Sequence, residues 1–164
     1  MKLHNKTFII FSPAFPANEA DSIWLPSLQT FVTALNRNFP ELDVIVIAFQ
    51  YPYTTKAYQW YNNKVIPFNG MYKKRAARLL MWLNIFFAVR KIKKEYSIIG
   101  IFSQWCGECT FVVKYVAKFF RLKYFCWILG QDARKENTYV KRIRPKAFSL
   151  ITLSDFLVDE FYKN

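Results

Sequence analysis

Residues that could do chemistry follow a strongly apolar run late in the chain. The run Tyr124–Leu129, which has the length and composition of a buried strand, leads directly into Gly130-Gln131-Asp132-Ala133-Arg134. In open α/β sheets, ligands bind beside the carboxyl ends of strands. We therefore expect Asp132 to contact a ligand hydroxyl or act as a general base, and Gly130 to take a positive φ or approach a ligand closely. The alternative is a turn in which Asp132 only caps the next helix.

A cysteine pair forms a second candidate site. The segment is Trp105-Cys106-Gly107-Glu108-Cys109, which follows a predicted strand and opens a predicted helix. This spacing at a helix start is similar to the thioredoxin redox motif, in which the helix N-terminus lowers the pKa of the first thiol and the second resolves the mixed disulfide. The alternative is that both cysteines pack the helix start. A zinc site would have only Cys126 and His4 as further ligands, so we expect no metal.

The elements that must position these segments alternate along the chain. Continuous apolar runs predict strands at Thr7–Phe11, Val44–Phe49, Lys64–Pro67, Ser97–Ser103, Tyr124–Leu129 and Ala147–Leu153. Apolar residues at helical spacing predict helices at Ile23–Phe39, Met71–Tyr96 and Gly107–Arg121, and Ser154 can cap a final one. Strands separated by helices need crossover connections, which give parallel pairing. The sequence therefore predicts a single α/β domain, a Rossmann-like parallel sheet with helices on both faces.

Charge is distributed unevenly over the 164 residues, whose formal net charge is +13. Up to Trp60 the basic and acidic residues cancel, so the whole surplus lies between Tyr61 and Asn164. Such asymmetry predicts a polyanionic partner for the later part of the chain. The 53% hydrophobic content is ample for one core and argues against disorder.

The predicted helix Met71–Tyr96 has basic residues at both ends and an apolar middle. Its basic residues are Lys73, Lys74, Arg75 and Arg78 at one end and Arg90, Lys91, Lys93 and Lys94 at the other. The middle, Leu79–Val89, is apolar nearly all round, which favours a helix lying partly in protein and partly in an anionic membrane surface. The alternative is a core helix covered on both sides. Nucleic-acid binding is the least favoured, since no recognised motif for it is present.

The sequence also indicates a compartment. Three cysteines give no even disulfide framework, and Pro13 interrupts the short apolar run near the N-terminus, so neither secretion nor a signal peptide is predicted. No uncharged stretch reaches the roughly 20 residues of a membrane-spanning helix. We expect a cytoplasmic protein, peripheral on the inner face of the cytoplasmic membrane.

The chain resembles the N-terminal domain of family 4 glycosyltransferases in four places. Phe8–Phe11 with Ser12–Pro16 is similar to that family's opening strand and substrate-facing loop. Phe102–Trp105 with Gly107-Glu108 is similar to a strand that ends in a polar and aromatic loop. The segment Gly130–Arg134 matches the Gly-x-Asp segment, and Thr152–Leu157 matches a late strand that ends in serine. The order and spacing of these motifs cover nearly the whole chain.

The resemblance implies a function and a site. Family 4 enzymes have two Rossmann-like domains (the GT-B fold), so residues 1–164 would be the acceptor-side domain, and the donor-binding domain with its paired glutamates would be absent. The full enzyme would transfer a sugar from a nucleotide donor to a lipid-linked or polysaccharide acceptor of the cell envelope, without a metal or other cofactor. Asp132 would be catalytic, and the substrate-binding residues would be Gln104, Trp105, Glu108, Gly130, Gln131 and Ser154. Leu129 stands where the family usually has histidine, and the chain alone is expected to be inactive.

Overall fold

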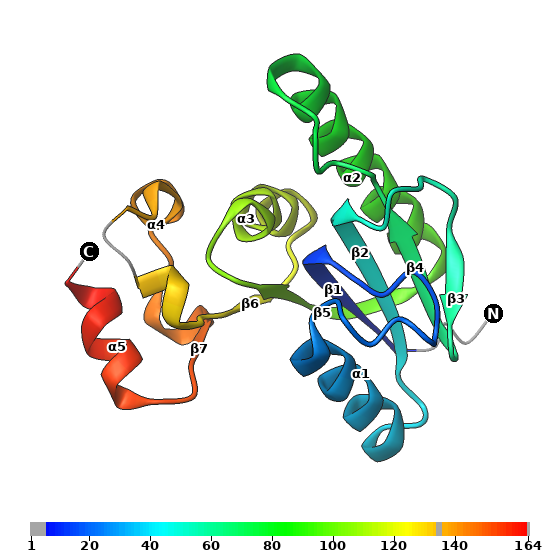
Figure 1. Ribbon diagram of the computed structural model, residues 1–164, viewed down its shortest axis with the longest axis horizontal. Coiled ribbons are helices and arrows are strands. Elements are labelled where there is room, and N and C mark those ends of the chain that lie inside the picture. The colour runs from blue at the N-terminus through cyan, green and yellow to red at the C-terminus, as the bar shows by residue number, and fades with distance from the viewer. Residues whose placement is uncertain (1–5, 134–135, 164) are drawn as a thin grey trace.

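The computed structural model describes residues 6–133 and 136–163, so that His4 and Arg134 lie outside the described residues. The described chain contains one seven-stranded sheet with the strand order β3-β4-β2-β1-β5-β6-β7 (Figure 1). The parallel strands are β1 (Lys6–Ala14), β2 (Asp43–Tyr51), β4 (Asn63–Pro67), β5 (Ser97–Gln104), β6 (Tyr124–Trp127) and β7 (Leu150–Ile151). The edge strand β3 (Tyr58–Trp60) is antiparallel to β4. The Rossmann-like α/β fold class is confirmed.

Helices cover both faces of the sheet because the central strands are apolar on both faces. Ile9 and Phe11 of β1 pack with α2 (Arg75–Glu95) and α3 (Glu108–Phe120). Ile10, between them in sequence, points to the other face and packs with α1 (Pro26–Asn38). Figure 1 shows α2 and α3 on one side of the sheet and α1 on the other, with α4 (Thr138–Ile143) and α5 (Asp155–Tyr162) at the β7 end.

Several predicted boundaries are wrong, each for a local reason. The first helix begins at Pro26 rather than Ile23, because Leu25 takes a left-handed φ of 51° and proline suits the first helical position. The second begins at Arg75 rather than Met71. The predicted strand Ala147–Leu153 is only Leu150–Ile151, preceded by a 3₁₀ turn at Ala147–Ser149. Strand β3 and helix α4 were not predicted.

One glycine carries a packing constraint that the sequence did not show. Gly70 donates its N–H to the carbonyl oxygen of Phe49 at 2.8 Å, which ties the loop after β4 to β2. A Cβ at Gly70 would lie 2.5 Å from that same oxygen and 2.5 Å from Sδ of Met81. A Cβ at Gly130, by contrast, would meet nothing within 4 Å.

These two glycines make a matched pair of substitutions. We expect Gly70→Ala to lower the free energy of unfolding by about 1–3 kcal/mol, because overpacking against backbone forces the chain to shift. Gly130→Ala should change it by less than about 0.5 kcal/mol. Urea denaturation of both variants measures the difference. Equal stabilities for the two would contradict the packing argument.

Candidate functional site

The carboxyl ends of the central strands form the candidate site. From β1 the chain builds β2 and β4 on one side and then crosses over to build β5, β6 and β7 on the other. The switch point therefore lies between β1 and β5, which is where open α/β sheets bind ligands. The predicted residues Gln104 and Trp105 stand at the end of β5, and Gly130 and Gln131 follow β6.

Gln104 has an unused hydrogen-bonding group at this switch point. Its side chain is 0% exposed, and its Oε1 lies 3.1 Å from the hydroxyl of Ser12 on the neighbouring strand β1. The amide Nε2 has no hydrogen-bond partner among the described residues. A buried donor without a partner costs about 1–3 kcal/mol. Because Gln104 is fully enclosed, a ligand or water meets this donor only after the side chains that cover it move.

Two tryptophans beside Gln104 offer donors of the same kind. Trp105 donates its backbone N–H to the carbonyl oxygen of Trp127 at 3.0 Å, which holds the ends of β5 and β6 together. The indole Nε1 atoms of both residues are buried and have no partner in the part of the chain that the structure describes. Trp105 also takes a left-handed φ of 67°, a strained conformation for a bulky residue. Strain of this kind gathers at functional sites.

Asp132 is buried rather than open to the edge. The residue is only 4% exposed, and its Oδ2 accepts the N–H of Leu129 at 2.9 Å. This bond takes the N–H of Leu129, so β6 ends at Trp127 and a 3₁₀ turn, Gly130–Ala133, follows. Burial raises the pKa of Asp132 to about 6, although backbone hydrogen bonds from Leu129 and Cys106 oppose the rise. The observed geometry is thus that of a turn-forming carboxyl group, and its catalytic role stays a prediction.

Asn137 joins the loops that follow β5 and β6. Its Nδ2 donates to the carbonyl oxygens of Cys106 at 3.0 Å and Asp132 at 3.2 Å. Its Oδ1 accepts the N–H of Tyr139 at 3.1 Å and so caps α4. Of the two roles predicted for Gly130, a positive φ is not found, since none of the described glycines has one, and close approach to a ligand stays a prediction. Gly130 and Gln131 are both exposed.

Glu108, predicted to bind substrate, is engaged elsewhere. Its Oε1 lies 2.6 Å from Nε of Arg78 and 2.7 Å from Nε1 of Trp82, and its Oε2 lies 2.7 Å from Nη2 of Arg78. The residue is buried at the start of α3. These contacts bind α3 to α2 and occupy both carboxylate oxygens. Ser154, which is exposed, caps α5 by accepting the N–H of Leu157 at 3.4 Å.

The redox alternative is not supported by the cysteines. Cys106 and Cys109 are buried and free. A hydrogen bond with the thiol of Cys126, together with burial, raises the pKa of Cys106. A thioredoxin-like nucleophile needs an accessible thiol with a lowered pKa. The cysteines instead pack the start of the helix, and the described residues contain no cluster of metal-ligating side chains.

The eight basic residues around α2 divide into two groups. Three are held by the protein: Lys73 donates to the carbonyl oxygen of Asn69 at 2.8 Å, Lys93 to that of Phe120 at 2.7 Å, and Arg78 to Glu108. Lys93 is nevertheless exposed, as are the other five, Lys74, Arg75, Arg90, Lys91 and Lys94. Among the described residues, no helix is long and apolar enough to cross a membrane.

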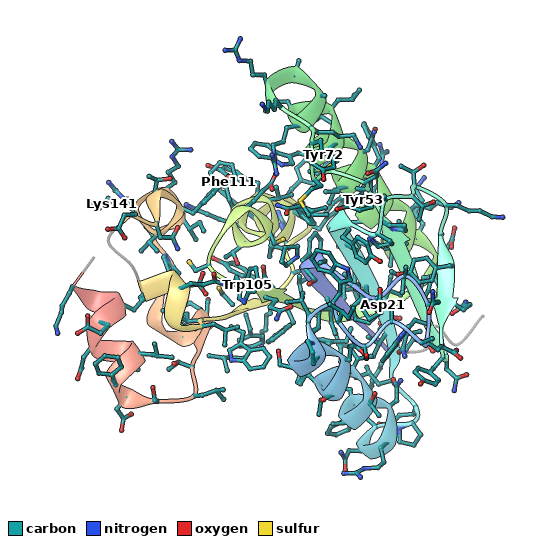
Figure 2. The ribbon with its side chains drawn as sticks, viewed as in Figure 1. Asp21, Tyr53, Tyr72, Trp105, Phe111 and Lys141 are labelled. Carbon is teal, nitrogen blue, oxygen red and sulfur yellow. The ribbon has the colours of Figure 1, made fainter. Side chains whose placement is uncertain are left out.

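An aromatic cluster beside the switch point was not predicted as part of the site. Trp24 stacks on Tyr51 with ring centroids 4.3 Å apart, and Tyr53 stacks on Tyr72 (Figure 2). Asp21 supports the cluster by accepting the hydroxyl of Tyr51 at 3.0 Å. Burial alone would raise the pKa of Asp21, but its hydrogen bonds outweigh burial and lower it. Only the density of aromatic residues after β2 signalled this feature in the sequence.

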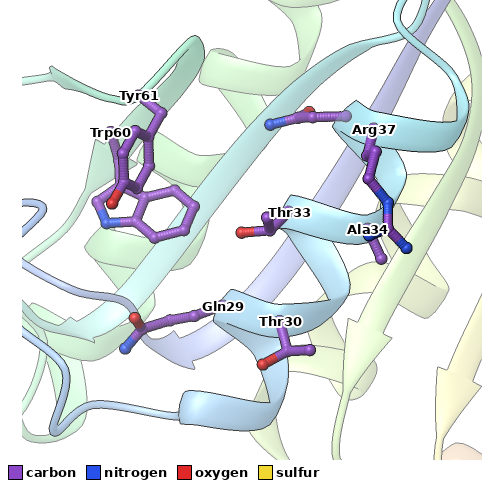
Figure 3. Close-up of a pocket in the computed structure, with 8 residues that line it drawn as sticks. Gln29, Thr30, Thr33, Ala34, Arg37, Trp60 and Tyr61 are labelled. Carbon is purple, nitrogen blue, oxygen red and sulfur yellow. The ribbon is translucent and has the colours of Figure 1, made fainter.

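A separate cavity lies away from these residues, between α1 and the end of β3 (Figure 3). Its volume is about 790 Å³, and polar side chains of α1 face the rings of Trp60 and Tyr61 across it. None of the residues predicted for the site lines this cavity.

Comparisons with known proteins show the fold. No family model and no curated protein matches the sequence. The chain is similar to the solved sucrose-phosphate synthase (tll1590) from Thermosynechococcus elongatus, with a TM-score of 0.65 and 13% identity, over 98% of this chain and 45% of that one. It therefore spans less than half the length of that protein, a GT-B glycosyltransferase. A probable GTP-binding protein, engB, aligns over 96% of this chain and 97% of its own with 11% identity and a TM-score of 0.44, which is too low to carry an argument.

The raised pKa of Asp132 makes a prediction about stability. A carboxyl group with a folded pKa of about 6 holds its proton more tightly than in the unfolded chain, whose value is 3.8, so stability falls as pH rises from about 4 to 6. Asp132→Asn keeps an oxygen for the N–H of Leu129 but cannot ionise. The difference in free energy of unfolding between the wild type and this variant should fall by up to about 3 kcal/mol over that pH range, and it should not change further above pH 7. Urea denaturation at several pH values measures it; a difference that does not vary with pH would contradict the assignment.

Proposed function

We propose that this chain is the N-terminal, acceptor-side domain of a family 4 glycosyltransferase of the GT-B fold. The complete enzyme would transfer a sugar from a nucleotide donor to a lipid-linked or polysaccharide acceptor, with donor binding in a second domain. The observation that carries the proposal is the unpartnered amide of Gln104, buried at the switch point of a Rossmann-like sheet. The likeness in fold to a sucrose-phosphate synthase supports the class, and the four sequence motifs support the family.

In this proposal the orphan donors of the carboxyl edge bind hydroxyl oxygens of the acceptor. Gln104, Trp105 and Trp127 each hold a buried nitrogen donor that the protein itself leaves unused, and binding of the acceptor would move the side chains that cover these atoms. Aromatic rings nearby offer flat apolar surfaces to the apolar faces of a sugar. Gln131 and Ser154 stand exposed beyond the ends of β6 and β7. Asp132, with a pKa of about 6, could exchange a proton near neutral pH if the turn opens on binding.

Nuclear magnetic resonance can test the proposed saccharide site, because side-chain amide and indole N–H groups give separate signals. Titration with a panel of disaccharides should shift the side-chain amide of Gln104 and the indole N–H signals of Trp105 and Trp127. Gln104→Met should weaken binding about tenfold or more, because the amide donor is lost. Its stability should be little changed, since the variant removes an unpartnered donor, and the Ser12 hydroxyl that loses Oε1 keeps the carbonyl oxygen of Ala14 as its acceptor. Gln59→Met, on the exposed face of β3, is the control and should bind as wild type does.

Binding of a nucleotide sugar to this chain would contradict the acceptor-side assignment. If donor binding belongs to another domain, uridine diphosphate glucose should bind this chain more weakly than about 1 mM. Calorimetry that gives a micromolar dissociation constant would contradict the acceptor-side assignment. Saccharide shifts confined to the cavity beside α1 would move the site away from the carboxyl edge.

We further propose that the protein works on the inner face of the cytoplasmic membrane, with α2 against the lipid. Met81, Ile85 and Val89 of α2 are buried against the sheet. On the outer face, the side chains of Leu79, Leu80, Leu83 and Phe87 are each more than half exposed. The exposed cations near both ends of α2 would meet anionic head groups, at about 1 kcal/mol per charge near the surface. Leucines that stay exposed between cations favour an interface helix over a core helix.

Vesicle binding tests this orientation. Leu83→Ser with Phe87→Ser should lower the partition onto vesicles of phosphatidylglycerol by tenfold or more, because two large apolar side chains no longer enter the interface. Ile23→Ser, which removes a residue 83% exposed outside α2, should leave binding unchanged. Neutral phosphatidylcholine vesicles should bind more weakly than anionic ones. Equal loss from Ile23→Ser, or no preference for anionic lipid, would contradict the proposal.

A further inference from the structure

A cationic cavity lies at the edge of the sheet opposite the candidate site. Its volume is about 780 Å³, and it lies beside the amino ends of β6 and β7. The second half of α3 forms one wall, the end of α4 and the 3₁₀ turn before β7 form the other, and Leu122–Phe125 form the floor between them. The volume falls within the roughly 300–1,000 Å³ of small-molecule sites.

The charged residues that line this cavity all have the same sign. They are Lys114, Lys118, Arg121, Lys123, Arg144 and Lys146, and among the residues that the structure describes no aspartate or glutamate lines the cavity with them. The single hydrogen bond that engages one of these charged groups within the described residues joins Nζ of Lys114 to the carbonyl oxygen of Arg142, at 3.4 Å. Cations gathered within a Debye length of about 8 Å repel one another at physiological salt. An anion in the cavity would relieve that repulsion.

Apolar and aromatic groups lie among these cations. Phe148 is 76% exposed, and Nζ of Lys146 lies 5.6 Å from the centroid of its ring. Tyr124 and Phe125 are partly buried at the start of β6 and contribute to the lining. The cavity therefore suits a ligand that joins several anionic oxygens to an apolar or aromatic body. A lone carboxylate would leave most of the cations unmatched, whereas phosphate groups present several charged oxygens to lysine and arginine.

We infer that this cavity binds a phosphate-bearing ligand, at a site separate from the acceptor site. Strands β6 and β7 run parallel, so their amino ends, at the cavity, and their carboxyl ends, at Trp127 and Ile151, lie on opposite edges of the sheet. A ligand in the cavity therefore does not compete with one at Gln104. The cavity also accounts for part of the positive surplus beyond Trp60 that the exposed cations of α2 do not use.

Calorimetry with inorganic tripolyphosphate tests the inference on the whole chain. The variant Lys118→Gln, Lys123→Gln, Lys146→Gln removes three exposed cations from the cavity without altering a residue of left-handed φ. The charge-matched control is Lys6→Gln, Arg37→Gln, Lys56→Gln, whose residues are exposed and lie outside the cavity. We expect wild type and control to bind alike, and the cavity variant to bind at least tenfold more weakly.

Vesicles of phosphatidylglycerol in phosphatidylcholine distinguish the source of the phosphate. Tripolyphosphate binding that the cavity variant loses and the control keeps indicates a soluble phosphorylated ligand. Vesicle binding with that same pattern, and no heat from tripolyphosphate, indicates a lipid head group in the cavity. Equal loss in both variants would show only the attraction of a polycation for anions and would overturn the inference. Binding that neither variant alters would overturn it as well.

Discussion

The contact of Arg78 with Glu108 is the interaction on which the position of the candidate site most depends. Glu108 is buried at the start of α3 and receives two hydrogen bonds from Arg78 and one from Trp82, all within 2.7 Å. Removing one partner of such a pair strands a buried charge, at a cost of about 3–5 kcal/mol. Because α3 begins at Glu108, the pair sets where the loop after β5 must end. That loop contains Trp105, and Gln104 directly precedes it.

Hydrogen bonds within and between the loops after β5 and β6 hold the rest of the carboxyl edge in place. Asn137 bonds to Cys106 in one loop and Asp132 in the next, while the carboxyl group of Asp132 closes its own turn on Leu129. The loops are thereby held by buried polar groups rather than by continued strand pairing. Such networks rigidify a site when every member is paired. Against this paired background, the buried nitrogens of Gln104, Trp105 and Trp127 are unpaired exceptions at this edge, and the indole nitrogen of Trp60, away from the edge, is another.

The three surfaces singled out lie on different parts of one scaffold. The carboxyl edge contains buried nitrogen donors without partners, together with aromatic rings. The outer face of α2 carries exposed leucines, and cations line the cavity beside α3. Under the proposals made above, this separation would let the domain rest against a membrane and hold a phosphorylated group without covering the proposed acceptor site. The positive surplus of the chain is thus divided between a helix surface and a cavity.

The sequence by itself determined the sheet and its layers. The strand Val44–Phe49 and the second half of the strand Ser97–Ser103 are buried on both faces. Such strands need covering helices on both sides, so the alternating pattern was enough to predict a Rossmann-like fold. Short elements were missed, because strand β3 and helix α4 depend on contacts with neighbouring segments more than on their own pattern.

Side-chain partners, by contrast, were decided only by the tertiary structure. The sequence marked Gln104, Glu108 and Asp132 alike as polar residues beyond strand ends. In the fold, Glu108 pairs with Arg78, which lies 30 positions earlier in another helix, and the carboxyl group of Asp132 accepts the backbone N–H of Leu129. The fold leaves the Nε2 of Gln104 without a partner. The same fold partly buries Lys73 and Arg78 of the predicted basic surface and gathers other cations, distant in sequence, around one cavity. Periodicity reports which face of an element is buried, but a polar group's partner comes from another element, and packing alone decides which one.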